Sequence, residues 1–374
     1  MAIKSDYPIR ILHVLGSLNL GGAQSFVMNI YREIDRTKFQ FDFVIHTNEK
    51  CIFTEEVLSL GGRIYSCPSY KGVNHIEYCR WWNAFLKKKS FALIHGHVRS
   101  TASIYLKIAK KHKVKTISHS HSTASGSNIK GMVKNFLQYP IRFTSDYFLA
   151  CSKDAGSWLF GKKIIDSPKF SIINNAINTE SFIFNEDIRR ELRIRYGIND
   201  RLVVGHIGRF TKEKNHEKIL GIYHELYKLD EKSMLVLVGE GDEQEYIKKL
   251  VEKLKLSENV LFMGAKTNVA DLLQMFDVFL FPSLWEGLGM AVIEAEASGL
   301  ECVVSSEVPK EVDITNLVHF IDLKTENSIW AKKVLDIGTG YIRRNMQKEI
   351  RANNYDVQVT TDWIEKYYNK VINS

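Results

Sequence analysis

The sequence predicts an α/β protein built from two doubly wound domains, each a parallel sheet covered by helices. The chain has 374 residues, which is too long for one ordinary core and makes two domains the default. Short apolar runs of strand length alternate with longer segments of helical periodicity. The alternation occurs in two successive sets, and residues 172–182, rich in asparagine, form the expected hinge between them.

The strand-like runs are mostly apolar and end close to glycine or polar residues. Those of the first half are IRILHVLG at 9–16 and the runs at 41–46, 92–97, 115–121 and 147–152. Those of the second half lie at 202–208, 233–239, 259–264, 278–283 and 300–306. We therefore place an N-terminal domain at 1–175 and a C-terminal domain at 176–357.

Composition excludes several classes of protein. Hydrophobic residues make up 45% of the chain and charged residues 25%, as in soluble globular proteins. No apolar run reaches the roughly 20 residues of a membrane span, and the N-terminus lacks the apolar core of a signal peptide. The five cysteines are scattered without C-x-x-C spacing, which is typical of reduced thiols in a cytoplasmic protein.

The net charge of +8 is concentrated in one region. Residues 80–175 carry seventeen basic side chains and three acidic ones, whereas acidic side chains outnumber basic ones, 32 to 26, from residue 176 onward. This basic region is either a set of solvated lysine faces or a surface for an anionic partner, such as a membrane, a nucleic acid or a phosphorylated acceptor.

Phosphate-binding features follow two of the expected strands, at the strand ends where doubly wound sheets bind ligands. Gly21 and Gly22 lie between the first strand and the first helix, where backbone amides can approach an anion. Arg209 and Lys214, in GRFTKEKN, follow the run at 202–208 and can bind phosphate oxygens, although two solvated cations would give the same spacing.

The stretch PSLWEGLGMAVIEAEASG, residues 282–299, combines glycines with carboxylates. Gly287 and Gly289 allow amides at a helix N-terminus to face phosphates. Glu286 precedes that helix, and Glu294 lies in its second turn, so both carboxylates can accept hydrogen bonds from hydroxyl groups. A sugar nucleotide offers hydroxyls on both sides of a diphosphate, which is the ligand this pattern indicates.

The E-x7-E pair of Glu286 and Glu294, with GRF and EKN upstream and a glycine loop in the first domain, resembles the retaining GT-B glycosyltransferases. The resemblance spans nearly the whole chain and is greatest to the exopolysaccharide and capsular branch. It implies two Rossmann-like domains facing across a cleft, with the acceptor on the first and the nucleotide sugar on the second. It also implies that residues 358–374 cross back to the first domain, and Trp363, Tyr367 and Val371 form an apolar stripe suited to dock there.

The resemblance assigns roles residue by residue. Arg209 and Lys214 bind the diphosphate, Glu294 the ribose hydroxyls, and Glu286 the transferred sugar without acting as nucleophile. The expected donor-binding set is Gly21, Gly22, Gly208, Arg209, Lys214, Gly264, Ala265, Lys266, Glu286, Gly287, Leu288, Gly289 and Glu294. Transfer proceeds with retention at the anomeric carbon, and UDP is the expected nucleotide.

Members of the family often carry a functional histidine after a strand of the first domain, and the SHSH stretch offers His119 and His121. Strand alternation points both to the same side, so either fits, and a structural role for either stays open. We favour His121 because it is nearest the end of the strand. The catalytic set is then His121, His119, Glu286, Arg209 and Lys214.

The missing D-x-D motif and one extra carboxylate also bear on the site. No D-x-D occurs in the sequence, so we expect no metal-bridged donor and no obligatory metal or other cofactor. Glu296 occupies a helix position that is usually uncharged in the family. We interpret it as a solvated residue or a neighbour of the site, and not as a third catalytic carboxylate.

Other functions use some of these features. A sugar-nucleotide epimerase can share the two-domain fold, but the paired glutamates favour transfer. A two-carboxylate glycosidase leaves the cations and the glycine loop unexplained. An oxidoreductase needs the full G-x-G-x-x-G pattern, and a nucleic-acid-binding protein would not need the acidic second half.

The basic region also predicts a location. In this branch acceptors are commonly saccharides on polyprenyl diphosphate, which is anionic and held in a membrane. Residues 131–143 mix apolar residues with Lys134 and Arg142, as interfacial segments do. We expect a cytoplasmic protein peripheral on the inner face of the plasma membrane, with an anionic membrane surface as partner and no nucleic acid.

Overall fold

The computed structural model describes residues 8–121, 138–340 and 342–374, which divide into two compact units. Unit 1 contains Met1–Ile177 and Asn354–Ser374, and unit 2 contains Asn178–Asn353. The limits expected at residues 175 and 357 lie within a few residues of these, and the first junction falls inside the asparagine-rich segment 172–182.

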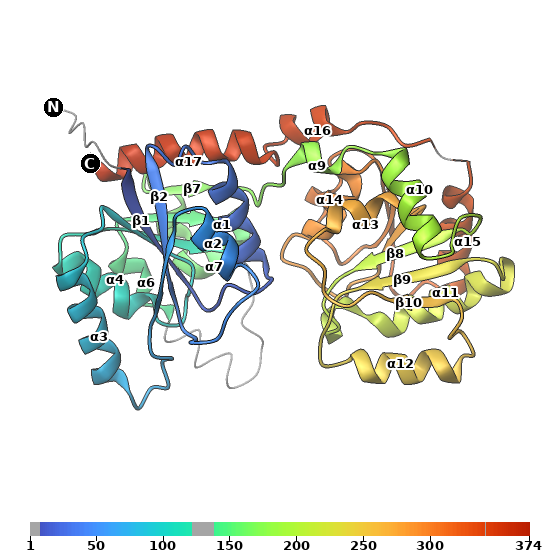
Figure 1. Ribbon diagram of the computed structural model, residues 1–374, viewed down its shortest axis with the longest axis horizontal. Helices are drawn as coiled ribbons and strands as arrows, with labels where there is room; N and C mark the ends of the chain where they lie inside the picture. The colour runs from blue at the N-terminus through green and yellow to red at the C-terminus, as the bar shows by residue number, and fades with distance from the viewer. Residues whose placement is uncertain (1–7, 122–137, 341) are drawn as a thin grey trace. The chain divides into compact units, whose positions relative to one another are not determined.

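Unit 1 is a parallel sheet covered by helices (Figure 1). Its strands are β1 (Ile9–Leu15), β2 (Phe39–Ile45), β3 (Arg63–Ser66), β4 (Leu93–Gly96), β5 (Lys115–Ser120), β6 (Tyr147–Ala150) and β7 (Phe170–Ile172). Its helices are α1 (Gly22–Glu33), α2 (Thr54–Ser59), α3 (His75–Lys88), α4 (Ala102–Lys111), α6 (Ile141–Thr144), α7 (Lys153–Phe160), α8 (Lys162–Ile165) and α17 (Val357–Ile372).

Unit 2 has the same architecture. Its strands are β8 (Val203–Ile207), β9 (Met234–Val238), β10 (Val260–Phe262), β11 (Val278–Phe281), β12 (Glu301–Ser305) and β13 (Val318–Ile321). Its helices are α9 (Thr179–Phe182), α10 (Glu186–Arg195), α11 (His216–Leu229), α12 (Gln244–Lys253), α13 (Val269–Gln274), α14 (Met290–Ala297), α15 (Asn327–Gly338) and α16 (Gln347–Ala352), with 3₁₀ turns at Lys212–Lys214 and Lys310–Val312.

Both sheets are doubly wound. Among the described residues the strand order is β3-β2-β1-β4-β5-β6-β7 in unit 1 and β10-β9-β8-β11-β12-β13 in unit 2, and every pairing is parallel. The order reverses between β1 and β4 and again between β8 and β11. Rossmann-like sheets bind their ligands at this switch point. The predicted fold class is confirmed.

The interior strands are largely buried on both faces of their sheets. Every residue of β2 and of β11 is buried, as expected for strands with helices packed on both sides of the sheet. The sequence patterns missed β3, β7 and β13, and each of them lies at the edge of its sheet. These edge strands are short and only partly buried, so their apolar signal is weak.

The C-terminal helix α17 packs on unit 1, as the sequence predicts (Figure 1, red helix). Asp356 caps it by accepting hydrogen bonds from the backbone amides of residues 358 and 359. Ile364, Tyr368 and Val371 join the core that α1 forms on one face of the sheet. Each buried side chain of this size contributes roughly 1.5–3 kcal/mol, so α17 is part of the unit's stability.

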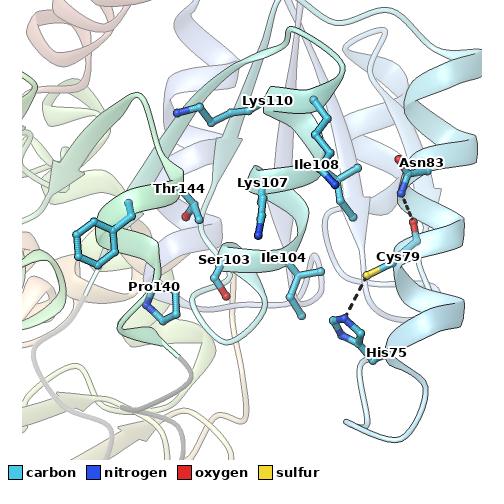
Figure 2. A pocket seen from close by; sticks show the side chains of 12 residues that line it. His75, Cys79, Asn83, Ser103, Ile104, Lys107, Ile108, Lys110, Pro140 and Thr144 are labelled. Atoms are coloured by element: carbon cyan, nitrogen blue, oxygen red, sulfur yellow. Dashed lines mark hydrogen bonds between the residues drawn. The ribbon is translucent and has the colours of Figure 1, made fainter.

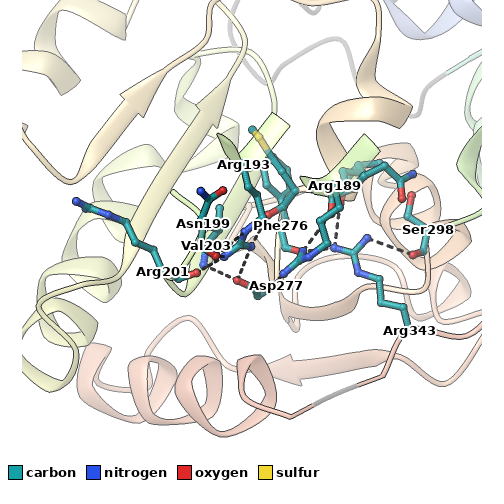
Figure 3. A network of polar contacts seen from close by, with 12 residues as sticks. Arg189, Arg193, Asn199, Arg201, Val203, Phe276, Asp277, Ser298 and Arg343 are labelled. Carbon is teal, nitrogen blue, oxygen red and sulfur yellow. Dashed lines mark hydrogen bonds and ion pairs between the residues drawn. The ribbon is translucent and has the colours of Figure 1, made fainter. Parts of the chain in front are cut away.

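A polar network fixes the start of β8 against the start of β11 (Figure 3). The carboxylate of Asp277 accepts from Arg189 at 2.5 Å, from Arg193 at 3.1 Å and from the backbone amide of Val203 at 2.7 Å. Arg193 is buried, and desolvation lowers its pKa even though Asp277 opposes this effect. The pairing therefore holds α10 and the two central strands together.

We predict that Asp277→Ala destabilises unit 2 by about 3 kcal/mol, because it leaves the Arg193 guanidinium buried without its counter-charge. Urea unfolding of the purified protein measures the change. The control is Asp187→Ala, which breaks the exposed pair with Arg190 and should cost less than about 1 kcal/mol. Equal losses in the two variants would contradict a special role for the buried network.

Candidate active site

The candidate site of unit 2 lies where β8 and β11 end beside each other. Lys214 ends the 3₁₀ turn after β8, and Glu286 lies in the loop after β11. The Lys214 ammonium donates to Glu286 Oε1 over 2.6 Å, and the two side chains are 18% and 12% exposed. The same ammonium lies 4.8 Å from the centre of the Phe281 ring. The sequence predicts both charged residues in the site, and the structure pairs them.

Two hydrogen bonds tie these loops together. Asn215 adopts a left-handed conformation with φ of 57°, which suits asparagine better than most residues. Its side-chain amide donates to the carbonyl of Pro282 over 3.0 Å. The amide of Leu284 donates to the carbonyl of Glu213 over 2.8 Å. The loops after β8 and β11 are thus bound to each other through the residues on both sides of Lys214.

The backbone around Gly208 is tightly packed. A Cβ atom on Gly239 would lie 2.0 Å from the carbonyl oxygen of Gly208, and one on Gly241 would lie 2.5 Å from the carbonyl oxygen of Phe210. Real Cβ atoms do not approach so closely, so both glycines are needed. A Cβ on Gly208 would itself lie 3.3 Å from the side chain of Lys214. This packing holds the segment that carries Lys214.

The glycine-rich loop opens α14 at Gly289, whose φ of 102° favours glycine. The first amides of a helix have no partner within the helix, and no side chain caps them here. Gly287 and Leu288 are partly exposed just before them. The start of α14 therefore has the uncapped amides that the predicted anion site requires, and anion binding there stays a prediction.

Glu294 lies in the second turn of α14 and is partly exposed. Desolvation raises the pKa of its carboxyl to about 7. A protonated and an ionised form therefore coexist near neutral pH in the free protein. A ligand that donates hydrogen bonds to the carboxylate will favour the ionised form.

The remaining predicted donor residues lie on loops at the same edge of the sheet. Arg209 follows β8 and is exposed, with no ion pair among the residues that the structure describes. Ala265 and Lys266 are exposed after β10, beside Gly264 with φ of 67°. Sequence reasoning missed Glu240, whose carboxylate accepts from the Ala265 amide over 3.2 Å. It lies in an acidic turn, where no pattern separates it from its neighbours.

The interpretation of Glu296 as a solvated residue is wrong. Its side chain is fully buried, and its Oε1 atom accepts from the amides of Ile314 and Thr315 and from the Thr315 hydroxyl. Burial raises its pKa to about 8, although these hydrogen bonds act in the opposite direction. Glu296 holds a loop beside α14 and is not placed to contact a donor.

In unit 1 the predicted glycines open helix α1. Gly21 precedes the helix, so no side chain caps the first amides of α1. Gly22 has open space where a Cβ atom would lie. Both follow β1, one of the two strands at the switch point of this sheet. The structure places both at the start of α1, and their contact with a phosphate stays a prediction.

Five histidines lie on one face of the unit 1 sheet, in β1, β4 and β5 or directly after these strands. They form two hydrogen-bonded chains. In the first, His13 Nδ1 lies 3.0 Å from His97 Nε2, and His97 Nδ1 lies 2.8 Å from His121 Nε2. In the second, the Tyr368 hydroxyl lies 2.8 Å from His95 Nδ1, and His95 Nε2 lies 3.2 Å from His119 Nδ1.

Burial distinguishes His119 from His121, the two candidates for the functional histidine. The side chain of His119 is fully buried, whereas that of His121, directly after β5, is partly exposed. Desolvation and the charge of Arg99 lower the pKa of His121 to about 3, and desolvation lowers the pKa of the other four well below the ordinary value. All five rings are therefore neutral at physiological pH.

The same histidines are the groups, within the described ranges, that could hold a metal ion. His13, His95 and His97 form one set, and His97, His119 and His121 form another, with nitrogens within 4.8 Å of one another. Neither set contains a carboxylate, so a divalent cation would be buried with no compensating charge. Several of these nitrogens already hydrogen-bond to each other, which favours a network of neutral rings.

Comparison with known proteins identifies the family. The family model described as Glycosyltransferase Family 4 matches residues 20–181, and that of Glycosyl transferases group 1 matches residues 188–317. The EpsF protein of Bacillus subtilis is 34% identical over 369 residues, which cover 96% of each chain. The chain belongs to this family of glycosyltransferases. It is also 27% identical, over 76% of both chains, to an Escherichia coli UDP-Gal:α-D-GlcNAc-diphosphoundecaprenol α-1,3-galactosyltransferase.

Solved structures agree on the fold of this glycosyltransferase. HepE of Anabaena, determined in complex with UDP-glucose, superposes with a TM-score of 0.79 at 16% identity, and the match covers 97% of this chain and 100% of the other. The resemblance to a GT-B glycosyltransferase predicted from the sequence is thus confirmed for family and fold. No helix in the described residues is long and apolar enough to cross a membrane.

The pKa of Glu294 predicts how stability depends on pH. Because the folded-state pKa of about 7 exceeds the ordinary value, this group favours the folded state at low pH, and the contribution is lost as pH rises through 7. Glu294→Gln removes the ionisable carboxyl group, and with it the loss of folding stability at high pH. The variant should therefore gain stability relative to the wild type at pH 8 and little at pH 5, as urea unfolding at the two pH values would show. A variant equally affected at both would contradict the raised pKa.

Proposed function

We propose that this glycosyltransferase moves a sugar from a UDP-sugar to a lipid-linked saccharide, with retention of anomeric configuration, in the synthesis of a cell-surface polysaccharide. The observation that carries the proposal is the Lys214–Glu286 pair beside the open start of α14. The names of two similar proteins support the substrates, since one is a diphosphoundecaprenol-dependent galactosyltransferase and the other binds UDP-glucose.

The diphosphate is the part of the donor that the cations recognise. Lys214 has three N–H bonds, and its bond to Glu286 leaves the others for phosphate oxygens. Arg209 is exposed on the same loop and can bind two oxygens at once. The amides at the start of α14 add hydrogen bonds and the positive end of the helix dipole. These groups stabilise the charge that develops on UDP as the glycosidic bond breaks.

The two carboxylates recognise hydroxyl groups. Glu286, at the end of β11, accepts hydrogen bonds from the transferred sugar, and Glu294 accepts them from the ribose. Lys214 neutralises Glu286, which allows a carboxylate to lie close to a diphosphate. The same pairing makes Glu286 a weaker nucleophile, so it positions the sugar and forms no covalent intermediate.

Unit 1 supplies the acceptor side in this proposal. His121 lies at the end of β5, and a neutral ring there can hydrogen-bond to a substrate oxygen.

The reaction needs no metal, because the cations and amides already compensate the leaving group. Activity that persists in EDTA would support this, and activity restored only by a divalent cation would contradict it.

A cavity of about 850 Å³ lies among α3, α4 and α6 in the basic region (Figure 2). Ile104 and Phe143 line it together with Lys107 and Lys111. Phe143 is 72% exposed. Exposed apolar groups beside lysines suit the surface of an anionic membrane. Of the segment 131–143, residues 131–137 lie outside the described part of the chain.

We expect Glu294→Gln to weaken UDP binding by roughly 1.5–3 kcal/mol, or about ten- to a hundredfold in Kd, because the ribose hydroxyls lose a charged acceptor. Isothermal titration with UDP measures this. Combined with the expected gain in stability at pH 8, weaker binding cannot be ascribed to unfolding. Unchanged affinity would remove Glu294 from the ribose site.

We expect Arg209→Ala to lower kcat at least tenfold for release of UDP from UDP-sugars, with little change in melting temperature, because the side chain is exposed and acts on developing charge. Arg190→Ala, which removes an exposed arginine of α10, is the matched control. The anomeric configuration of the product, read by proton NMR, tests retention, and an inverted product would refute that part of the proposal.

We expect the protein to sediment with vesicles containing anionic lipid at low salt, and to be released at high salt. Each basic residue near such a surface contributes about 1 kcal/mol, so the double variant Lys107→Gln and Lys111→Gln should bind about thirtyfold more weakly. The control is Lys249→Gln with Lys253→Gln, which has the same spacing on α12 of unit 2. Absence of binding to anionic vesicles, or equal binding to neutral ones, would favour a water-soluble acceptor.

A further inference from the structure

The cavity among α3, α4 and α6 has two kinds of side chain on the wall that α4 forms (Figure 2). Ser103, Lys107 and Lys111 recur every four residues, so they share one face of that helix. Ile104 and Ile108 form an apolar row directly beside them. The wall thus presents a hydroxyl and two cations along one line and aliphatic side chains along the next.

The facing wall comes from α3. His75, Cys79 and Asn83 also recur every four residues, so they form one row along that helix. Cys79 Sγ lies 3.6 Å from His75 Nε2, and the side-chain amide of Asn83 donates to the carbonyl of Cys79 over 2.8 Å. Both contacts stay within α3. The row is polar, and it places a thiol opposite the lysines of α4.

The charge of this cavity is positive and only partly compensated. Lys110 pairs with Asp146 over 2.9 Å, whereas Lys107 and Lys111 make no ion pair among the described residues. Both are exposed, and they lie one turn apart, about 6 Å along the axis of α4. No aspartate or glutamate occurs among the described residues that line the cavity. An anion there meets two ammonium groups with no carboxylate in the lining.

The cavity has the size and the place of a ligand site. Its volume of about 850 Å³ falls within the range of roughly 300–1,000 Å³ that is typical of small-molecule sites. Ser103 lies in the first turn of α4, which follows β4 at the switch point of the unit 1 sheet. Lys111 is the last residue of the helix. The cavity therefore extends about 12 Å along α4, starting at the ligand-binding edge of the sheet.

These features together fit an anion that is carried on an apolar chain. A diphosphate offers oxygens to two ammonium groups at once. An inorganic anion would leave Ile104 and the 72% exposed Phe143 in water, and a neutral lipid would leave the lysines without a counter-charge. A nucleic acid supplies the phosphates but no apolar chain. An anionic lipid satisfies both rows of α4.

We propose that this cavity binds the diphosphate end of a polyprenyl diphosphate, the lipid carrier of the acceptor. Its phosphates lie on Lys107 and Lys111, and its first isoprene groups lie against Ile104 and Phe143. This inference rests on the proposed function for the lipid-linked acceptor, but binding of the carrier is measurable without any transfer. It goes beyond attraction to an anionic membrane, because a cavity selects one headgroup whereas a charged surface attracts all anionic ones.

Cys79 provides a reporter for occupancy of the cavity. It lines the cavity and is partly exposed, whereas the other four cysteines are buried. Alkylation by iodoacetamide, followed by peptide mass spectrometry, should therefore be fastest at Cys79. We expect geranyl diphosphate, a short and water-soluble polyprenyl diphosphate, to slow alkylation of Cys79 about tenfold or more at saturation. Isothermal titration gives its affinity independently of the thiol, and absence of binding would overturn the proposal.

Two control ligands each carry one half of the probe. Geraniol lacks the charge, and inorganic diphosphate lacks the apolar chain. We expect each to need at least about tenfold higher concentrations than geranyl diphosphate to protect Cys79. Equal affinity for inorganic diphosphate would show a simple anion site, and equal affinity for geraniol would show a simple apolar one. Either result would contradict the proposed carrier.

Substitutions separate the cavity from the general positive field of the basic region. We expect Lys107→Gln to weaken binding of geranyl diphosphate about tenfold, because a charged donor is lost. Phe143→Ala should weaken it too, while leaving the affinity for inorganic diphosphate unchanged. Lys87→Gln is the matched control, because Lys87 is an exposed lysine of the same basic region, on α3, that does not line the cavity. Equal losses in Lys107→Gln and Lys87→Gln would refute the site.

A phospholipid probe and a donor assay complete the test. Dihexanoyl phosphatidylglycerol carries a single phosphate and should bind at least about tenfold more weakly than geranyl diphosphate. Equal affinity would assign the cavity to membrane phospholipid and overturn its assignment to the acceptor. Binding of geranyl diphosphate by a protein that releases no UDP from any UDP-sugar would refute the transferase and leave the cavity assignment supported. Release of UDP without binding of geranyl diphosphate would refute the cavity assignment alone.

Discussion

The parallel pairing of β8 with β11 is the constraint on which the donor site depends. Parallel strands end at the same edge of a sheet, and at the switch point the loops leave in opposite directions. Lys214 and Glu286 are separated by 72 residues in the chain, and only this pairing brings them within 2.6 Å. Asp277 holds the beginnings of both strands, and Asn215 joins the loops at their ends.

The sequence predicted the interior of each sheet and missed most of the edges. Interior strands such as β2 and β11 are buried on both faces, and their mostly apolar runs can be recognised without neighbours. The edge strands β3, β7 and β13 have partly exposed residues and depend on a partner strand to form. No local pattern contains that partner, so the limits of a sheet are harder to predict than its centre.

The site residues also include some features that the sequence could predict and others that it could not. The placement of Glu286 and Lys214 could be predicted because each follows an interior strand, but their ion pair requires the strand order. The burial of Glu296 could not be predicted, because α14 is apolar on nearly every side and its sequence has no polar face to mark the solvent. The histidine chains needed the register of three strands, in which His13 lies opposite His95.

The two units present polar groups in opposite ways. In unit 2 the site is charged, and it lies at partly exposed loop ends where bound phosphate and water can compensate each group. In unit 1 the histidines lie deeper, where an isolated charge would cost far more than a hydrogen bond returns. Neutral imidazoles meet that limit, since each can both donate and accept a hydrogen bond without placing a charge in the core.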